Sequence, residues 1–216
     1  MYKPRSFATD DVAAMHRLIR AHGFGTLVTP HADGVEISHI PMFLEVEADA
    51  PYGVLLGHVA KANPHWRQFE AGASFAIFCG PHGYISPGWY AERLTVPTWN
   101  YAVVHAHGRP DLVVERAPLK ALVTRLAEIY EAPLGHPWDM ETAAEAIDAE
   151  LGGIVGFRMP IERLDGKFKL SQNRSVADRA GVVAALEKSN PELAGMMRET
   201  FPDDAVKADN GLLSEG

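Results

Sequence analysis

The residues around Lys61 have the types and spacing of an anion site. The stretch Gly57–Trp66 (GHVAKANPHW) runs from a strand-like segment into a helix start, where Asn63 can cap the helix and Pro64 can take its first position. Free backbone N–H groups at a helix start, together with a cation, favour a phosphate group. The sequence therefore predicts a phosphate site at Lys61, and the alternative is a solvent-exposed lysine near a helix start.

A second group, VPTWN, follows a loop rich in Pro, Gly and aromatic residues. Thr98 and Asn100 offer hydrogen-bond donors and acceptors, and Trp99 offers a flat apolar face. This combination suits a planar heteroaromatic ligand. The alternative is a Trp that packs in the core or in a dimer interface. The loop lies between two predicted strands, 74–79 and 100–107, and its aromatic content indicates a binding loop.

A third group contains His105 and His107, which point to one face of a predicted strand. Two histidines can begin a metal site, and His58, His65 and His82 could supply further ligands. The sequence has no HExxH motif and no fixed carboxylate partner for them. We therefore predict structural histidines and no metal.

The fourth group is the stretch 167–174 (KFKLSQNR), which is basic and polar in an acidic chain. Alternation places Lys167, Lys169 and Ser171 on one face of a strand. This pattern indicates contact with an anionic ligand, or else a solvated edge strand whose lysines prevent aggregation.

Composition limits the class of protein. The chain has 216 residues, 47% hydrophobic content and a formal net charge of −8, which counts against a surface evolved to wrap nucleic acid. Its single cysteine, Cys79, excludes an intramolecular disulfide, and its apolar surroundings predict a buried side chain. We find no apolar run of membrane-spanning length and no signal peptide, so we expect a cytoplasmic protein without a membrane partner.

The order of predicted elements indicates a mainly β protein with peripheral helices (α+β), because strands do not alternate with helices in βαβ units. We expect a closed or split antiparallel barrel with six to eight strands. Its domain would span 1–174, with inserted helices at about 117–151, and a helical extension at 175–216 would pack on the barrel. The predicted strands are 24–29, 35–46 (bent or at an edge at Pro41), 52–59, 74–79, 100–107, 111–115, 154–164 and 167–173. The first predicted helix starts at Thr9 or Asp10 and runs to about His22. The other predicted helices cover 61–69, 118–130, 141–151, 175–186 and 191–200.

These stretches together resemble the PaiB family, described as FMN-binding negative transcriptional regulators. The motifs that carry the resemblance stand in the family's chain order: FGTLVT, SHIP, GHVAKANPHW, GPHGYISPGWY, VPTWNYAVVHAHG and KLSQNRS. The resemblance extends from Met1 to about Glu199. It implies the FMN-binding split barrel, a fold shared with pyridoxamine-phosphate oxidases and flavin reductases, and a homodimer with flavin at the subunit interface.

The resemblance also implies cofactor-binding residues. The two strands that flank the flavin ring correspond to Thr26, Val28, Thr29, Ser38, His39, Ile40 and Pro41. The phosphate-binding residue corresponds to Lys61, with His58 and Asn63 nearby. Residues that the partner subunit places over the ring correspond to Thr98, Trp99, Asn100, Lys169, Ser171, Gln172 and Asn173.

The resemblance leaves the activity open. The paired arginines that bind pyridoxal phosphate in the oxidases are not evident, which argues against vitamin B6 oxidation. We find no clear helix-turn-helix, and the helical pair at 175–200 has mixed charges, so direct DNA binding has little support. The alternatives are a flavin-dependent oxidoreductase of unknown substrate and a haem-binding or haem-degrading protein that uses His58, His105 or His107. No catalytic residue is predicted.

Overall fold

The computed structural model describes residues 1–92, 94–135 and 143–202. The chain folds into two compact units. Unit 1 contains Met1–Asp10, Cys79–Val103 and Gly166–Gly216, and unit 2 contains Asp11–Phe78 and Val104–Asp165. The predicted boundary between residues 174 and 175 stays a prediction.

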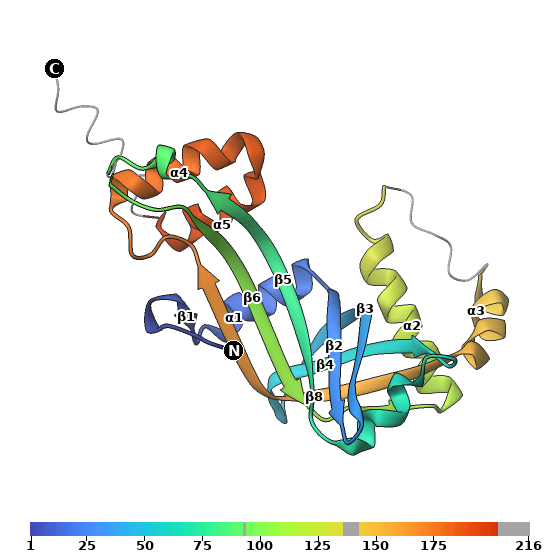
Figure 1. Cartoon of the computed structure of the whole chain (residues 1–216). Coiled ribbons are helices and arrows are strands. Elements are labelled where there is room, and N and C mark those ends of the chain that lie inside the picture. Colours follow the sequence, from blue (N-terminus) through green and yellow to red (C-terminus); the bar gives the residue numbers. More distant parts are fainter. Residues whose placement is uncertain (93, 136–142, 203–216) are drawn as a thin grey trace. The chain divides into compact units, whose positions relative to one another are not determined.

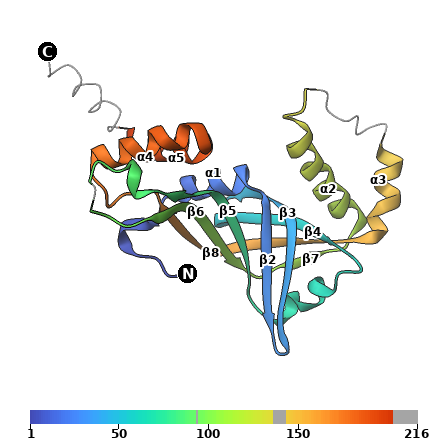
Figure 2. The ribbon, with the colours of Figure 1, turned by 45° about the horizontal axis from the view of Figure 1, so that its top comes forward.

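Unit 2 is built on the long hairpin of β2 (Phe24–His31) and β3 (Gly34–Glu47), shown in Figure 2. The two strands pair antiparallel from Phe24↔Pro41 to His31↔Gly34, so the Asp-Gly signal forms the predicted turn. Met42 begins the pairing of β3 with β4 (Ala50–Ala60). Pro41, which lacks an N–H, therefore lies where β3 changes partner and not on the sheet edge.

Two helices of unit 2, α1 (Val12–Ala21) and α2 (Arg116–Glu131), each bury one face. α1 buries Met15, Leu18 and Ile19, and its N-cap is Asp11, one or two residues after the predicted start. α2 packs Leu122 and Leu126 against Phe43 of the sheet. α3 (Ala144–Glu150) follows, and then η4 (Leu151–Gly153) (Figure 1). None of the helices in the described ranges is long and apolar enough to cross a membrane.

The remaining elements of unit 2 are a short helix and further strands of its sheet. η2 (Pro64–Ala71) is a 3-10 helix with the predicted Asn63 cap, because the Asn63 side chain accepts from the His65 N–H. β7 (Asp111–Val113) pairs with β8 (Ile154–Lys169), and β8 also pairs with β4.

Unit 1 encloses its own apolar cluster. η1 (Arg5–Phe7) leads into β1 (Ala8–Thr9), which pairs with residues 166–167 of β8. α4 (Val176–Ser189) and α5 (Pro191–Thr200) pack side by side, as Figures 1 and 2 both show, and confirm the predicted helical pair. The buried apolar cluster of unit 1, to which α4 and α5 contribute, consists of Ile85, Tyr90, Leu170, Val182, Leu186, Leu193, Ala194 and Met197.

The strands β5 (Ser74–Ile85), β6 (Thr98–Gly108) and β8 contribute residues to both units. The strand order is β1-β8-β4-β3-β2-β5-β6, and β6 also pairs with β8, so the succession of strands returns to β8. This closed succession of strands fits the predicted antiparallel barrel, and the eight strands of the sheet agree with the predicted six to eight.

Three local predictions are wrong. β5 continues to Ile85, so the aromatic loop is shorter than predicted, and its described residues include η3 (Pro87–Trp89). β8 continues through Asp165-Gly166 to Lys169, because β1 pairs with it there and no turn forms. Cys79 is exposed, because Ser74, Ala76 and Phe78 take the buried face of β5. Trp138 and the C-terminal tail, predicted as loop and frayed end, lie outside the described residues except for Phe201 and Pro202.

Candidate functional site

A buried hydrogen-bond network joins four elements of unit 2 around His65. The imidazole Nδ1 lies 2.8 Å from Ser38 Oγ, and Nε2 lies 2.8 Å from Thr29 Oγ1. Thr29 Oγ1 is in turn 2.7 Å from Ser74 Oγ, and Asn63 Nδ2 donates to Ser38 Oγ at 2.9 Å. His65, Thr29 and Ser74 are each 0% exposed. The network therefore fixes η2 against β2, β3 and β5.

Burial lowers the pKa of His65. The charge of Glu36 raises this pKa and that of His31 lowers it further, but burial is the largest effect. The neutral imidazole has one donor and one acceptor, which matches one hydroxyl on each side of the ring. Thr29, Ser38 and Asn63, all predicted cofactor residues, thus bind protein groups and position the chain next to Lys61. The sequence marked His65 only as a possible metal ligand and missed Ser74, because their contacts join distant parts of the chain.

Lys61 lies immediately before η2 and is exposed. Its backbone N–H donates to Gly153 O at 2.8 Å, and its carbonyl accepts from Trp66 Nε1 at 3.1 Å. The backbone at this position is therefore held from two sides. Within the described residues the ammonium group has no hydrogen bond or ion pair, so its charge is available to a ligand.

The other predicted residues of β2 and β3 divide between the two faces of the hairpin. Thr26 and His39 are direct cross-strand partners on the outer face, and Thr26 Oγ1 lies 2.9 Å from His39 Nδ1. Val28 is 8% exposed on the same face of β2, and Ile40 is 9% exposed on the opposite face of β3. Pro41 is half-buried.

His58 lies apart from these residues, in a mostly apolar cavity of about 390 Å³. The cavity is lined from α2, α3, η4 and β4, with Val123, Ile147 and Leu151 among its walls. Burial lowers the pKa of His58, and its Nδ1 atom is buried without a hydrogen-bond partner in the described part of the chain. No hydrogen bond in the described part of the chain joins His58 to the His65 network, although Gly153, which accepts from Lys61 N, also lines the cavity of His58.

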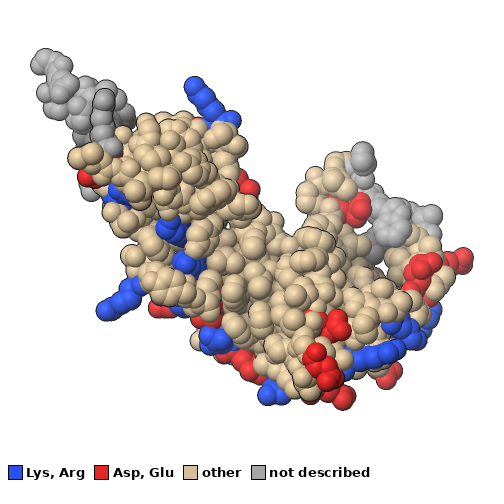
Figure 3. Space-filling view, viewed as in Figure 1, with Lys and Arg blue, Asp and Glu red and all other residues tan. Residues whose placement is uncertain are grey.

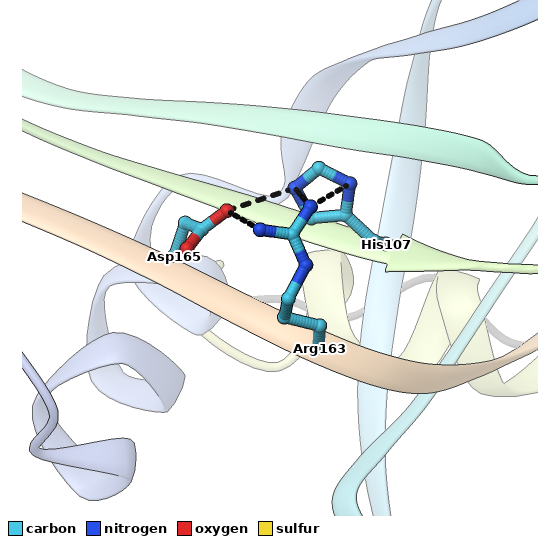
Figure 4. A network of polar contacts seen from close by, with 3 residues as sticks. All are labelled: His107, Arg163 and Asp165. Carbon is cyan, nitrogen blue, oxygen red and sulfur yellow. Dashed lines mark hydrogen bonds and ion pairs between the residues drawn. The ribbon is translucent and has the colours of Figure 1, made fainter. Parts of the chain in front are cut away.

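His107 belongs to a polar network with Arg163 and Asp165, shown in Figure 4. The Arg163 guanidinium donates to Asp165 Oδ2 at 2.6 Å and lies 3.1 Å from His107 Nδ1, and His107 Nε2 lies 3.2 Å from Asp165 Oδ2. Burial is the main cause that lowers the pKa of His107 and of its neighbour His105. No group of three or more His, Cys, Asp or Glu side chains in the described ranges is placed to hold a metal.

In unit 1, alternation along β6 separates the predicted residues Thr98, Trp99 and Asn100. Trp99 is 54% exposed and, with Cys79, Tyr101 and Val103, lines a mostly apolar cleft of about 480 Å³. The ring of Tyr84 meets Trp99 edge to face at a centroid distance of 6.1 Å. This cleft presents the flat apolar face that the sequence predicts for a planar ligand.

A second cavity of unit 1, of about 210 Å³, brings together predicted polar residues of the VPTWN motif and of the stretch 167–174. Its lining consists of Phe7, Tyr90, Val96, Pro97, Thr98, Asn100, Lys169, Ser171, Asn173 and Arg174. Gln172 does not line it but closes the adjoining turn, because its Oε1 accepts from Leu170 N at 2.7 Å and its Nε2 donates to Phe168 O. The cofactor residues implied by the resemblance include neither Tyr90 nor Arg174, although Arg174 ends the stretch 167–174, for which the sequence predicts contact with an anionic ligand.

Comparison with known proteins identifies the family. The model of the family described as "Putative FMN-binding domain" matches residues 1–163. The chain is 35% identical to the protease synthase and sporulation protein PAI 2 of Bacillus subtilis over 210 residues, which cover 96% of this chain and 99% of that protein. This match confirms the resemblance to the PaiB family.

Solved structures support the fold. The structure of a conserved hypothetical protein of Mycobacterium tuberculosis aligns with a TM-score of 0.57 at 14% identity, covering 80% of this chain and 92% of that chain. A flavocytochrome of Azotobacter vinelandii aligns with a TM-score of 0.55 at 13% identity, covering 75% and 69% of the two chains. At these identities the likeness concerns the fold alone. The family match shows that the chain belongs to the family described as "Putative FMN-binding domain", with FMN as its cofactor, and the solved structures show the fold.

Proposed function

We propose that the chain is a homodimeric flavoprotein, in which FMN lies between two copies and serves a redox or sensing role. The observation that carries this proposal is Lys61, an exposed cation on a backbone held from two sides, at the start of a capped helix. This arrangement fits a phosphate group, which gains from both the ammonium charge and the helix start. It lies within the part of the chain that the FMN-binding family model matches.

The outer face of the β2–β3 hairpin fits the remainder of the cofactor. Thr26 and His39 present an exposed hydroxyl and imidazole, which can hydrogen-bond the polar edge of a flavin ring. The buried His65 network behind them holds the strands and the Lys61 segment in one arrangement. The protein's contribution is therefore position and electrostatics, whereas bound FMN supplies the electron-transfer chemistry.

The same face supports pairing with a second copy. Phe24, Val35 and Ile37 are 68%, 51% and 54% exposed on β2 and β3. Large apolar side chains gathered on one sheet face indicate a surface that another protein covers. On the face drawn in Figure 3, Lys and Arg lie beside Asp and Glu along the lower edge, and much of the remainder carries neither. We propose that a second copy covers the apolar face and that Trp99 of the partner subunit packs against the flavin ring.

The regulatory role and the cytoplasmic location implied by the sequence stay predictions. α4 and α5 carry mixed charges, and Arg198 of α5 pairs with Glu187 of α4. This pairing removes a basic charge that a DNA contact would use. We therefore propose that any regulatory output depends on the flavin and not on direct DNA reading by these helices.

Titration with FMN, followed by flavin fluorescence and absorbance, tests the cofactor site. We expect Lys61→Gln to weaken FMN binding at least tenfold, because it removes the phosphate's cation. Lys188→Gln, at the exposed end of α4, is the matched control and should bind FMN like the native chain. Equal affinities of the native chain and Lys61→Gln would contradict this phosphate site. Failure of the native chain to bind FMN would contradict the proposed function.

A further inference from the structure

The 210 Å³ cavity of unit 1 concentrates positive charge. Lys169 and Arg174 both line it, and the lining contains no Asp or Glu. Lys167, which is 9% exposed, lies nearby with its ammonium group 5.2 Å from the centroid of Tyr101. In a chain of net charge −8, this local excess of cations needs an explanation.

Neutral groups hold the two cations that line the cavity, Lys169 and Arg174, in place. Lys169 Nζ donates to Trp99 O at 2.7 Å and to Thr98 Oγ1. The Arg174 guanidinium lies 4.4 Å from the centroid of Tyr90, and its Nη2 donates to Thr95 Oγ1 at 2.6 Å. Neither makes an ion pair within the described residues. Their charges are therefore oriented by neutral groups and have no carboxylate in direct contact in this part of the chain.

The pKa of Lys169 reflects the excess of positive charge around the cavity. Burial lowers the pKa of Lys169 first, and the positive charges of Lys167 and Arg174 lower it further. Asp178 interacts electrostatically with Arg174, but its carboxylate accepts from Glu92 N at 3.1 Å and does not line the cavity. An anion in the cavity would relieve the repulsion between these cations.

The walls of the cavity limit the shape of that anion. Ser171 has a φ of 68°, a left-handed conformation that is costly for a residue with a side chain. Buried Asn100 holds the Ser171 hydroxyl, with Nδ2 to Oγ at 2.9 Å, and Gln172 closes the turn. Phe7, Val96 and Pro97 supply apolar wall. The volume of about 210 Å³ equals that of about seven waters at ~30 Å³ each, which admits only a small molecule.

We propose that this cavity binds a small organic carboxylate, with its charge at Lys169 and Arg174 and its apolar body against Phe7 and Val96. The planar guanidinium matches a carboxylate in two parallel hydrogen bonds, and the lysine adds a second charge. Thr98 and Asn100 line this cavity, whereas Trp99 lines the apolar cleft. The site is therefore distinct from the proposed flavin face, and it does not depend on the proposed function.

Benzoate and benzamide are matched probes, because they have nearly the same shape and differ in charge. In calorimetric titrations of the full chain, we expect benzoate to bind at least tenfold more tightly than benzamide. Arg174→Gln and Lys169→Gln should each weaken benzoate binding at least tenfold, and Lys188→Gln should leave it unchanged. Unfolding of each variant in urea identifies one that fails to fold, so that Arg174→Lys, which keeps the charge but loses the planar fork, can replace Arg174→Gln.

Four results would overturn the proposal. Equal binding of benzoate and benzamide, or intact benzoate binding in Arg174→Gln, would remove the role of charge. Binding of inorganic phosphate without any binding of benzoate would mean that the site selects a phosphate group. A loss of FMN affinity in Arg174→Gln would place the cofactor's phosphate in this cavity, and the cavity would not be a separate site.

Discussion

Replacement of His65 by alanine tests whether the buried network holds the candidate site together. His65 is 0% exposed and links Ser38 on β3 to Thr29 on β2 through its two ring nitrogens. The substitution removes both hydrogen bonds and leaves a cavity beside Phe69, whose ring centroid lies 5.5 Å from that of His65. We expect a clear loss of folding free energy and a weaker hold on the Lys61 segment.

The magnitude follows from what each partner retains. Thr29 keeps Ser74 at 2.7 Å, and Ser38 keeps Asn63 at 2.9 Å, so neither hydroxyl loses every partner. Two lost hydrogen bonds cost ~2 kcal/mol, at about 1 kcal/mol each. The lost ring packing adds ~1–2 kcal/mol, at the low end for large-to-small core substitutions. The sum is a destabilisation of about 3–4 kcal/mol.

Urea unfolding at pH 7.5, followed by tryptophan fluorescence and circular dichroism, measures this loss. His31→Ala is the matched control, because His31 is only half-buried near the turn of the hairpin. We expect the control to stay within about 0.5 kcal/mol of the native chain. A loss of less than ~1 kcal/mol in His65→Ala, with an unchanged dependence on urea, would refute the reasoning.

Two further predictions concern stability. Burial lowers the folded-state pKa of His65 and of His107, so the unfolded chain binds more protons than the folded chain once the pH falls below about 6.5. Stability should therefore fall between pH 7 and pH 5, by up to ~1.4 kcal/mol per pH unit for each histidine. Urea midpoints across this range check this prediction, and a midpoint that rises on acidification would be incompatible with neutral buried histidines. Gly108→Ala should lower the free energy of unfolding by more than ~3 kcal/mol, because a Cβ there would lie 2.2 Å from Pro160 O. The control Gly152→Ala, whose Cβ would meet nothing within 4 Å, should change the urea midpoint little. Equal midpoints of the two variants would contradict the close backbone approach at Gly108.

Local signals in the sequence located most elements. The Asp33-Gly34 turn and the Asn63-Pro64 helix start form as predicted, because both depend on the conformational preferences of neighbouring residues. Asp165-Gly166 carries the same turn signal, but β8 stays extended there because Thr9 of the distant β1 pairs with Gly166. Long-range pairing thus overrides a local preference.

The candidate site was only partly predictable for the same reason. Lys61 and Trp99 lie in motifs whose chemistry is visible in a few consecutive residues. The contacts of His65 span 27 and 36 positions, and Arg174 reaches Thr95 across 79 positions. Which side chains share a network or a cavity therefore depended on the fold and not on spacing along the chain.

The separation of Thr98 and Asn100 from Trp99 illustrates a further limit. The motif VPTWN indicates one ligand surface, yet the alternation of β6 sends Trp99 to the apolar cleft and the other two residues to the basic cavity. A strand assignment that began at Asn100 concealed this division, because Thr98 and Trp99 were placed in a loop.

The central claim is that FMN binds between two copies of the chain, and complementation between variants tests it most directly. Lys61→Gln and Trp99→Ala, each weak in FMN binding, are co-expressed so that mixed dimers form. If Lys61 of one copy and Trp99 of the partner subunit share a site, random pairing restores native affinity at about a quarter of the sites, because half of the dimers are mixed and each carries one intact site. Titration that finds no native-affinity sites in mixed dimers verified by sedimentation, or sedimentation that finds only monomers with FMN bound, would contradict the account.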